Sequence, residues 1–398
     1  MRVVCVGGGP AGLYTALLAK LRYPGHEVRV LERDSALATY GWGVVFWDDL
    51  LDGLFAHDPV SANRIRQAAV LWNGQRVQLP GQRPAHLGGY GFSIARTALL
   101  GILAERAEGL GVEIQYEQPV HDPADLPDAD LVVAADGVRS ALRDRNAHRF
   151  GTTTQEGRNR YLWLGTSKVF DGFVFAFAPT QHGWVWIHGY PSAADRSTCV
   201  VECAPDTWRG LGLDGLGDAA AIRVLEEVFA DLLGGHSLLQ RAARTGGPAA
   251  WQTFREVVNQ TWYDGAVALA GDAAHTTHFT IGSGTKLAMQ DAMALADVLP
   301  ADAAGLPAAL RAYDERRRSA LQSVQRGAHR SMAWFEEVDR HLGPDPDGVE
   351  FAFELWKRRG DAPEWRHRLH TATQNPGLRW VRHEVSSARR IMRARRRG

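Results

Sequence analysis

The alternation of apolar runs and amphipathic stretches predicts an α/β fold. Arg2–Val6 is a short apolar run rich in valine, which is typical of a buried parallel strand. A helical pattern follows from Ala11 to Leu21, and Val28–Leu31 is a second apolar strand. Leu131–Ala135 and Val267–Ala270 predict two more buried strands.

A glycine motif joins the first strand to the first helix. The run Gly7-Gly8-Gly9-Pro10-Ala11-Gly12 satisfies G-x-G-x-x-G, and Glu32 ends the next strand twenty positions after Gly12. Gly7 allows the tight turn, Gly9 lets the backbone approach a pyrophosphate, and Gly12 lets helix and strand pack closely. Glu32 can accept hydrogen bonds from a ribose diol. Strand, motif, helix, strand and acid in this order predict a dinucleotide site, for FAD or for NAD.

Two later motifs favour FAD. The strand Leu131–Ala135 runs into Asp136–Arg143, and the strand Val267–Ala270 runs into Gly271–His275. An open α/β sheet binds ligands at its strand ends, where a carboxylate can hold a ribityl hydroxyl chain. The run Gly282–Lys286 then opens a helix whose N-terminus can stabilise negative charge on a reduced flavin.

Together these three motifs resemble the single-component FAD-dependent aromatic hydroxylases, the para-hydroxybenzoate hydroxylase class. The similarity spans residues 1 to about 340. It implies that Asp136 supports both cofactors, that Asp272 binds the flavin ribityl chain, and that Arg96 reaches the pyrophosphate. The cofactor-binding residues that motifs and resemblance predict are Gly7, Gly9, Ala11, Gly12, Glu32, Arg33, Arg96, Asp136, Gly137, Asp272, Gly284, Thr285 and Lys286.

The resemblance also implies an architecture: a Rossmann-like FAD-binding domain, an inserted β-sheet substrate domain and a helical C-terminal region. The predicted FAD-binding domain comprises 1–70, 91–157 and 255–304, the substrate domain 71–90 and 158–254, and the helical region 305–398. Segments rich in aromatic and β-branched residues predict one mixed or antiparallel substrate sheet: Tyr161–Phe170, Phe173–Phe177, Trp184–Tyr190 and Thr198–Cys203.

Within the class, the chain is most similar to a subgroup that acts on CoA esters, the salicylyl-CoA 5-hydroxylases and the N-terminal half of 2-aminobenzoyl-CoA monooxygenases. Thr277–Thr280 replaces the proline-rich turn of the class, and Lys286 replaces an asparagine. The resemblance implies hydroxylation of an electron-rich aromatic acyl thioester, para to a ring hydroxyl, with tightly but non-covalently bound FAD, NADH or NADPH, and O2. Only one G-x-G-x-x-G opens a strand-helix-strand unit, so no separate nicotinamide domain is expected.

Few polar side chains are candidates for contact with the substrate. His278 is the first choice, because it lies on the expected flavin face, and His188 and Tyr190 end a strand expected above the ring. The alternative for His278 is a structural histidine bonded to a turn. His275 and His278 have neither the spacing nor the neighbouring ligands of a metal site, so none is expected.

Three other functions compete with this interpretation. A flavin halogenase is one, but Ile187 comes one place early for W-x-W-x-I-P and no lysine lies between Lys20 and Lys168. A hydroxylase of a free arene or of an indole- or tryptophan-derived metabolite is another. A flavin-binding protein without catalysis is the third, because fold alone does not establish activity.

Composition adds little to these alternatives. The formal net charge is +0, which argues against nucleic-acid or membrane binding in bulk. Cys199 and Cys203 would lie about 13 Å apart along one strand, too far for a disulfide. Reduced cysteines and the absence of a leader or apolar span predict a cytoplasmic protein. The arginine-rich segment Arg389–Arg397 is either a solvated end or a patch for a polyanionic ligand.

Overall fold

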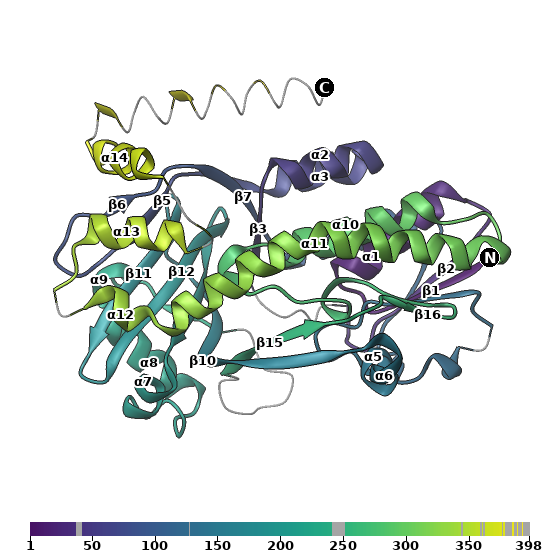
Figure 1. Cartoon of the computed structure of the whole chain (residues 1–398), viewed down its shortest axis with the longest axis horizontal. Helices are drawn as coiled ribbons and strands as arrows, with labels where there is room; N and C mark the ends of the chain where they lie inside the picture. The colour runs from purple at the N-terminus through teal and green to yellow at the C-terminus, as the bar shows by residue number, and fades with distance from the viewer. Residues whose placement is uncertain are drawn as a thin grey trace.

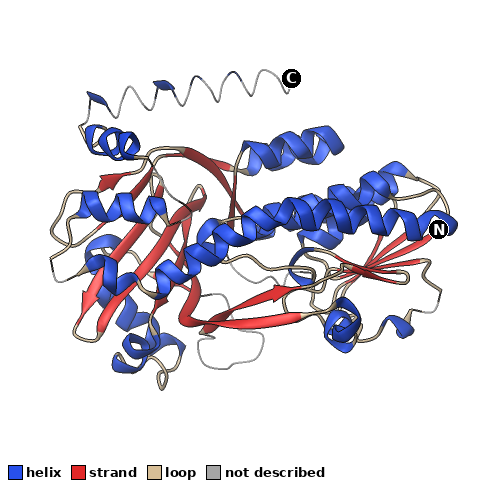
Figure 2. Cartoon of the chain, in the orientation of Figure 1, coloured by secondary structure: helices blue, strands red, loops and turns tan. Residues whose placement is uncertain are grey.

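The computed structural model describes residues 1–36, 42–126, 128–240, 251–343, 345–358 and 363–375, with the short stretches 360, 377–378, 384–385, 388 and 392. The arginines of 389–397 lie outside the described residues. Figure 1 shows two sheets at opposite ends of an elongated molecule, with long helices crossing between them, and Figure 2 separates helices from strands by colour.

The first sheet contains the N-terminal dinucleotide motif. Its strand order is β16-β17-β9-β1-β2-β8, and every pairing is parallel except that of β16 with β17. Helix α1 packs against both α4 and α10. The strands and these helices are β1 (Arg2–Val6), β2 (Glu27–Leu31), β8 (Glu113–Gln115), β9 (Leu131–Ala134), β16 (Tyr263–Asp264), β17 (Val267–Leu269), α1 (Pro10–Arg22), α4 (Arg96–Gly109) and α10 (Gly284–Val298). Because their strands are parallel, the loops after β1, β2, β9 and β17 gather at one edge.

The second sheet is mixed. Its order is β14-β10-β13-β12-β11-β5-β6, with β15 paired to β10, and only the pairing of β11 with β5 is parallel. Its strands are β5 (Gln75–Gln78), β6 (Ala85–His86), β10 (Thr153–Thr166), β11 (Phe173–Thr180), β12 (Gly183–Ala193), β13 (Arg196–Cys203), β14 (Leu238–Leu239) and β15 (Gln252–Val258). The predicted domain boundaries 157/158 and 254/255 fall inside β10 and β15, and the division into domains stays a prediction.

A small third sheet, β3-β7-β4, lies between the other two. It consists of β3 (Gly43–Phe46), β4 (Val70–Asn73) and β7 (Tyr90–Ala95), and the helices α2 (Asp48–His57) and α3 (Pro59–Ala68) follow β3. The short helices elsewhere are η1 (Pro123–Asp125), α5 (Ala141–Arg145), α6 (Ala147–Phe150), η2 (Gly271–Ala273), η3 (Phe279–Ile281) and η4 (Ala303–Gly305).

Helices cover both faces of the second sheet. On one face, Val185, Ile187 and Val201 pack against α8 and α9. On the other, Phe177 and Trp186 pack against Phe335 and its neighbours from the C-terminal region. The covering helices are α7 (Pro205–Gly210), α8 (Asp218–Val228), α9 (Ala230–Leu233), α11 (Leu306–Glu336), α12 (Val338–Leu342), α13 (Gly348–Lys357) and α14 (Glu364–Ala372).

Helix α11 links the two large sheets. Near its start, the Tyr313 hydroxyl donates to the Leu269 carbonyl at 2.9 Å, at the end of β17. Near its end, Phe335 lies in the core beneath the second sheet. Figure 1 shows this helix running along most of the molecule. It therefore fixes the spacing between the strand ends of the first sheet and one face of the second.

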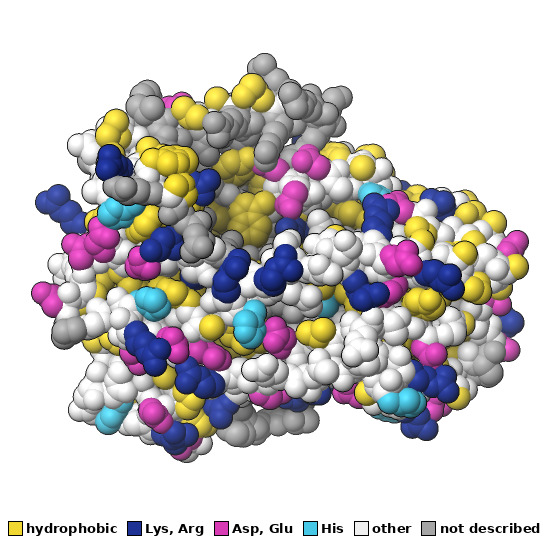
Figure 3. Space-filling view, in the orientation of Figure 1, with side chains coloured by type: hydrophobic (Ala, Val, Ile, Leu, Met, Phe, Trp, Pro, Cys, Tyr) yellow, Lys and Arg dark blue, Asp and Glu magenta, His cyan; other side chains and the backbone are white. Residues whose placement is uncertain are grey.

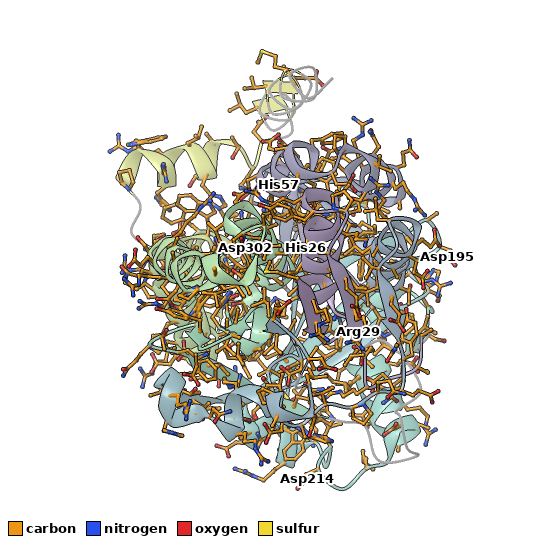
Figure 4. All side chains as sticks on the ribbon, turned by 90° about the vertical axis from the view of Figure 1, so that its right-hand side faces the viewer. His26, Arg29, His57, Asp195, Asp214 and Asp302 are labelled. Carbon is orange, nitrogen blue, oxygen red and sulfur yellow. The ribbon has the colours of Figure 1, made fainter. Side chains whose placement is uncertain are left out.

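Side-chain contacts at the far end of the first sheet hold α10 in place. His57 Nε2 lies 3.1 Å from Asp297 Oδ1, which ties α2 to the end of α10. His26 Nε2 lies 3.0 Å from the Ala301 carbonyl oxygen. Figure 4 looks onto this end and labels His26 and His57 near Asp302. Among the described residues no single helix is long and apolar enough to cross a membrane, and the one pair that passes together, α10 with 303–336, is bent by 114°.

Within the described residues the predicted strands and helices are confirmed, with shifted ends, and much of the predicted helical stretch after 375 lies outside them. Thr153–Arg160 extends β10 although it is polar, because part of this stretch pairs with β15. From its sequence, the stretch Ile94–Glu108 resembles one helix, but Ile94 and Ala95 belong to β7, because they pair with β3. Cys199 and Cys203 lie on one strand as free, buried thiols, as predicted.

Gly12→Ala should destabilise the protein, because a Cβ at Gly12 would lie 2.0 Å from the Gly7 carbonyl oxygen. We expect a loss of about 1–3 kcal/mol, from forced overpacking, measured as a lower thermal midpoint. Gly101→Ala in α4 is the matched control, because its Cβ would meet nothing within 4 Å. Alanine there should stabilise the helix by about 0.5–1 kcal/mol. Equal midpoints for both variants would contradict the close helix–strand contact.

Candidate functional site

The loop after β1 has the geometry of a phosphate-binding turn. Gly7 has φ +110°, and a Cβ there would lie 2.3 Å from the Ala135 carbonyl oxygen, so glycine is required. Gly9 caps α1, and a Cβ at Gly9 would meet nothing within 4 Å. The buried Ala11 lies in the first turn of this helix, close to Gly271. Open space thus adjoins a helix N-terminus, the arrangement that binds phosphate.

The acid at the end of β2 is held by backbone donors. Gly8 N–H donates to Glu32 Oε2 at 2.6 Å, and Asp34 N–H donates to Glu32 Oε1 at 2.9 Å. Both carboxylate oxygens therefore have fixed positions and retain capacity for further hydrogen bonds. Arg33 is exposed beside this acid, with Nε 3.9 Å from Asp34 Oδ1.

Asp136 lies just beyond the end of β9, next to the glycine loop. Its Oδ2 accepts from Ala141 N–H at 2.8 Å, while its buried Oδ1 has no hydrogen-bond partner within the described chain. Burial raises the pKa of Asp136, against the opposing effect of hydrogen bonds from Ser140 and nearby backbone. Gly137 has φ +88° and open space where a side chain would lie. A hydrogen-bond donor of a bound ligand would satisfy this Oδ1.

Asp272 lies in η2, directly after β17. Its side chain is exposed, and desolvation by the surrounding protein raises its pKa. The charge of Arg96 partly opposes this increase in pKa. Arg96 is the first residue of α4, and its backbone N–H donates to the Trp42 carbonyl at 2.9 Å. The structure thus brings Arg96 and Asp272 to one region.

A buried carboxylate on α10 fixes the loop that carries Asp272. Asp291 accepts from Gly271 N–H and His275 Nε2, each at 2.9 Å, and from Arg317 Nε at 2.7 Å. Burial raises the pKa of Asp291, but these interactions with His275 and Arg317 outweigh it and lower that pKa overall. Asp291 is therefore an ionised anchor for loop, α10 and α11. Sequence reasoning missed this role.

The first turn of α10 contains Gly284, Thr285 and Lys286. No Cβ contact would occur at Gly284 within 4 Å, so the backbone there is open to approach. Lys286 Nζ donates to Asp49 Oδ2 at 3.0 Å, an ion pair with α2. The lysine that replaces the asparagine of the class therefore lies at the α10 N-terminus with its charge partly compensated.

These residues fit the FAD that the motifs imply. The glycine loop before α1 offers an open helix N-terminus, Asp136 offers a buried oxygen with no partner in the described chain, and Asp272 offers an exposed carboxylate. Their order along the sheet edge matches a ligand with a pyrophosphate and a hydroxyl chain. Which of these side chains contacts the cofactor stays a prediction.

His278, the first-choice polar candidate, is buried between the two sheets. Its Nδ1 lies 2.8 Å from Thr280 Oγ1, which in turn lies 2.8 Å from Ser331 Oγ on α11. Arg358 Nε donates to that same Ser331 oxygen at 3.0 Å. Burial lowers the pKa of His278 to about 4, so this imidazole is neutral near pH 7.

His188 and Tyr190 lie on the face of β12 that is turned toward His278 and the small sheet. His188 Nε2 lies 3.0 Å from Glu202 Oε2, and the His188 ring lies 5.6 Å from that of Phe279 in η3. The Tyr190 hydroxyl donates to the Gly43 carbonyl of β3 at 2.8 Å, which occupies its proton. Sequence reasoning missed Glu202, which is only 1% exposed.

Comparison with known proteins agrees with this geometry. A family model described as an FAD binding domain matches residues 97–328, more than half of the chain. Salicyloyl-CoA 5-hydroxylase from Streptomyces sp is 38% identical over 90% of this chain and 70% of that protein. The chain belongs to the FAD-dependent aromatic monooxygenases.

Two further similarities concern this monooxygenase. A 3-hydroxy-4-methyl-anthranilyl-(aryl-carrier protein) 5-monooxygenase from Streptosporangium sibiricum is 36% identical over 96% of this chain and 100% of that protein. A crystallised variant of 2-methyl-3-hydroxypyridine-5-carboxylic acid oxygenase superposes with a TM-score of 0.67 at 20% identity, covering 90% of this chain and 93% of that one. The second similarity shows the shared fold alone.

Asp272→Ala should weaken the binding of FAD, because a ribityl hydroxyl would lose its acceptor. We expect a cost of roughly 1–3 kcal/mol, measured as a higher dissociation constant when FAD is titrated into the apoprotein. Asp206→Ala, an exposed acid on α7, is the matched control and should bind FAD like the wild type. Unchanged affinity in Asp272→Ala would remove this residue from the cofactor site.

Asp291→Ala should destabilise the whole monooxygenase, because Arg317 and His275 would lose their buried acceptor. Breaking one partner of a buried ion pair costs about 3–5 kcal/mol, and a thermal melt of the holoprotein measures the loss. Asp195→Ala removes a carboxylate from an exposed pair with Arg196 and should change the melt little. A similar midpoint for both variants would show that Asp291 is no anchor.

Proposed function

We propose that this monooxygenase hydroxylates an electron-rich aromatic acyl thioester, para to a ring hydroxyl or amino group. Salicylyl-CoA represents this substrate class. The similarity to an enzyme named for a salicyloyl-CoA ester carries the proposal, because it extends over 90% of the chain. We also propose NADH or NADPH as reductant, O2 as oxidant and a tightly held, non-covalent FAD.

The two named relatives share a chemical pattern. One name gives a 2-hydroxybenzoyl thioester and the other a 2-aminobenzoyl thioester, and both enzymes add oxygen at ring position 5. Position 5 is para to the hydroxyl or amino group at position 2. Such a group donates electron density to that carbon, so an electrophilic oxygen reacts there. The tether differs between them, since one is CoA and the other a carrier protein.

The surface between the sheets suits a flat aromatic ring. The space-filling view is hollowed above α11, between α2 and α13, and hydrophobic side chains form its floor (Figure 3). The small sheet lies behind this hollow. In this small sheet Trp72 lies 6.5 Å from Trp47 and 5.7 Å from Phe173, and the rings of Trp47 and Phe173 are half-buried. Aromatic walls favour ring stacking and exclude water.

Bound FAD would supply the oxygen-transfer chemistry, and the protein's own side chains have the simpler tasks of holding the ring and controlling its proton. His278, His188 and Tyr190 are the polar candidates for these tasks. His278 and His188 are neutral near pH 7, since burial lowers the pKa of both. A neutral imidazole can accept a proton from a phenol, which an imidazolium cannot.

A substrate panel tests the proposed function. Purified holoenzyme is supplied with NADH or NADPH and equal concentrations of salicylyl-CoA, 2-aminobenzoyl-CoA, a salicylyl-carrier protein and free salicylate. We expect kcat/KM for a thioester to exceed that of the free acid by at least about tenfold, equivalent to about 1.4 kcal/mol. Binding of the remote tether should position the ring and raise the rate itself.

Product mass and reductant oxidation are followed together, so that uncoupled turnover is not mistaken for hydroxylation. A product with one added oxygen at position 5 supports the proposal, and the preferred tether identifies CoA or carrier protein. Equal or faster hydroxylation of free salicylate would instead favour a small-arene hydroxylase.

A further inference from the structure

A buried carboxylate positions one of the candidate histidines. Glu202 on β13 accepts from His188 Nε2 and Trp186 Nε1 at one oxygen, each at 3.0 Å. Its other oxygen accepts from Asn159 Nδ2 at 2.8 Å. Glu202 and His188 are only 1% and 3% exposed. Three donors thus converge on one carboxylate, on the face of the second sheet that packs against Phe335.

The charge states of this pair fix where the histidine proton resides. Burial raises the pKa of Glu202, but its interactions with His188, His278 and Asn159 outweigh it, so this pKa is lowered and the carboxylate is ionised. Burial lowers the pKa of His188, so its imidazole is neutral at pH 7. An ionised carboxylate only accepts hydrogen bonds, so Nε2 carries the proton and Nδ1 has a free lone pair.

His188 Nδ1 is buried and has no hydrogen-bond partner in the described part of the chain. Trp163 Nε1, a donor, is likewise buried and unpartnered there. Trp163 pairs across the sheet with Val200, and Val200 pairs with His188, so the three side chains form one row on one face.

The row presents an acceptor and a donor about 10 Å apart at the backbone, on either side of an apolar residue. A 2-hydroxy- or 2-aminobenzoyl group carries a hydrogen-bond donor on the ring, which complements the free acceptor Nδ1 of His188. Buried polar atoms in folded proteins normally have partners. A ligand whose ring donor reaches His188 Nδ1 would satisfy this buried acceptor.

Aromatic side chains surround His188, and such surroundings favour binding of an aromatic ring. Its ring lies 5.6 Å from those of Phe175 and Phe279 and 4.9 Å from that of Phe335, which come from the sheet, the loop after β17 and α11. The place is therefore where the second sheet meets the loop that follows the Asp272 motif. Apolar walls exclude water, which strengthens a hydrogen bond to Nδ1.

Besides their mutual interaction, His188 and Glu202 are acted on by three titratable or charged groups: Arg358, His278 and Tyr161. Glu202 raises the pKa of His188, and Arg358 at the end of α13 lowers it. His278 and Tyr161 interact electrostatically with Glu202 from the loop and from β10. The positive charge of Arg358 would also favour an ionised phenol near His188, since it favours any anion.

We propose that His188 Nδ1 accepts the proton of the substrate's ring hydroxyl, with Glu202 as the positioning residue that fixes the histidine tautomer. The inference rests on the proposed function and assigns a residue to its proton step. The phenolic O–H bond breaks, an Nδ1–H bond forms, and the new imidazolium donates to both the phenolate and Glu202. No electrons are transferred, and the more electron-rich phenolate favours attack at the para carbon. A ring amino group would donate a hydrogen bond to the same nitrogen.

Ionisation of the bound ring can be measured without turnover. Salicylyl-CoA is bound to oxidised wild-type holoenzyme with no reductant. The absorbance of the phenolate is then followed from about pH 6 to about pH 10, which extends below the ordinary pKa of a phenol. We expect the bound ring to ionise at least about one pH unit below the free thioester. Ionisation of bound and free thioester at the same pH would overturn the inference, whatever the behaviour of variants.

His188→Phe removes the acceptor but keeps a ring among aromatic neighbours. Its kcat at neutral pH should fall about 100-fold, the scale of a lost general base. The kcat of this variant should recover as the pH approaches the pKa of the substrate's phenol, because an ionised substrate needs no base. His182→Phe, in the exposed turn between β11 and β12, is the matched control and should behave like wild type. A loss in His188→Phe that does not change with pH would overturn the inference.

Glu202→Gln separates positioning from proton transfer. The amide oxygen can still accept from His188 Nε2, but the charge that raises the pKa of His188 is gone. We expect a smaller loss of kcat than in His188→Phe, and an acidic limb of the pH profile shifted to lower pH. An acidic limb that does not move would contradict the role of Glu202.

Failure of the inference and failure of the proposed function are distinguishable. If the wild type hydroxylates no aryl thioester, the proposed function fails. If it does so while His188→Phe keeps the wild-type rate and pH profile, only the role of His188 fails. FAD absorbance and melting temperature of each variant show whether folding is retained, and the wild-type titration needs no variant.

Discussion

The buried Asp291 carboxylate is the interaction on which the site depends. It receives one donor from the loop after β17, one from His275 within that loop and one from Arg317 on α11. This single carboxylate therefore joins helix α10, helix α11 and the edge of the first sheet. Because α11 continues to Phe335 beneath the second sheet, the same anchor sets the distance between the two halves of the site.

A second buried carboxylate plays the corresponding part in the second sheet. Glu202 gathers Asn159, Trp186 and His188 from two neighbouring strands, as Asp291 gathers groups around the flavin loop. Burying a charge is costly unless its hydrogen bonds are all made, so each carboxylate requires its donors at defined positions. This requirement makes the polar geometry between the sheets rigid, and rigidity is what orientation of a small aromatic ring needs.

The sequence predicted the strands of the cofactor edge, because their signals are local, while the contacts of the residues there with FAD stay a prediction. The glycine turn, Glu32, Asp136 and Asp272 each follow a strand directly, and parallel strands bring such positions together without further information. The ends of β10 were predicted less well. Thr153–Arg160 is polar and is held as strand partly by pairing with β15, about a hundred residues away. Pairing at that separation leaves no periodic trace in the strand itself.

The polar residues expected to contact the substrate were harder to predict, because their arrangement also depends on pairing between strands far apart in the sequence. His188 and His278 could be named as candidates from their types and neighbours, but Glu202 lies in an apolar strand and carries no motif. Its importance depends on the register that places it opposite Trp186, so that Trp186 and His188 can donate to the same oxygen. Register in a sheet is set by the whole set of strands. Glu202 orients His188 only through this register. The role of Glu202 can therefore be inferred only from the assembled sheet, whereas His188 could be named as a candidate from the sequence.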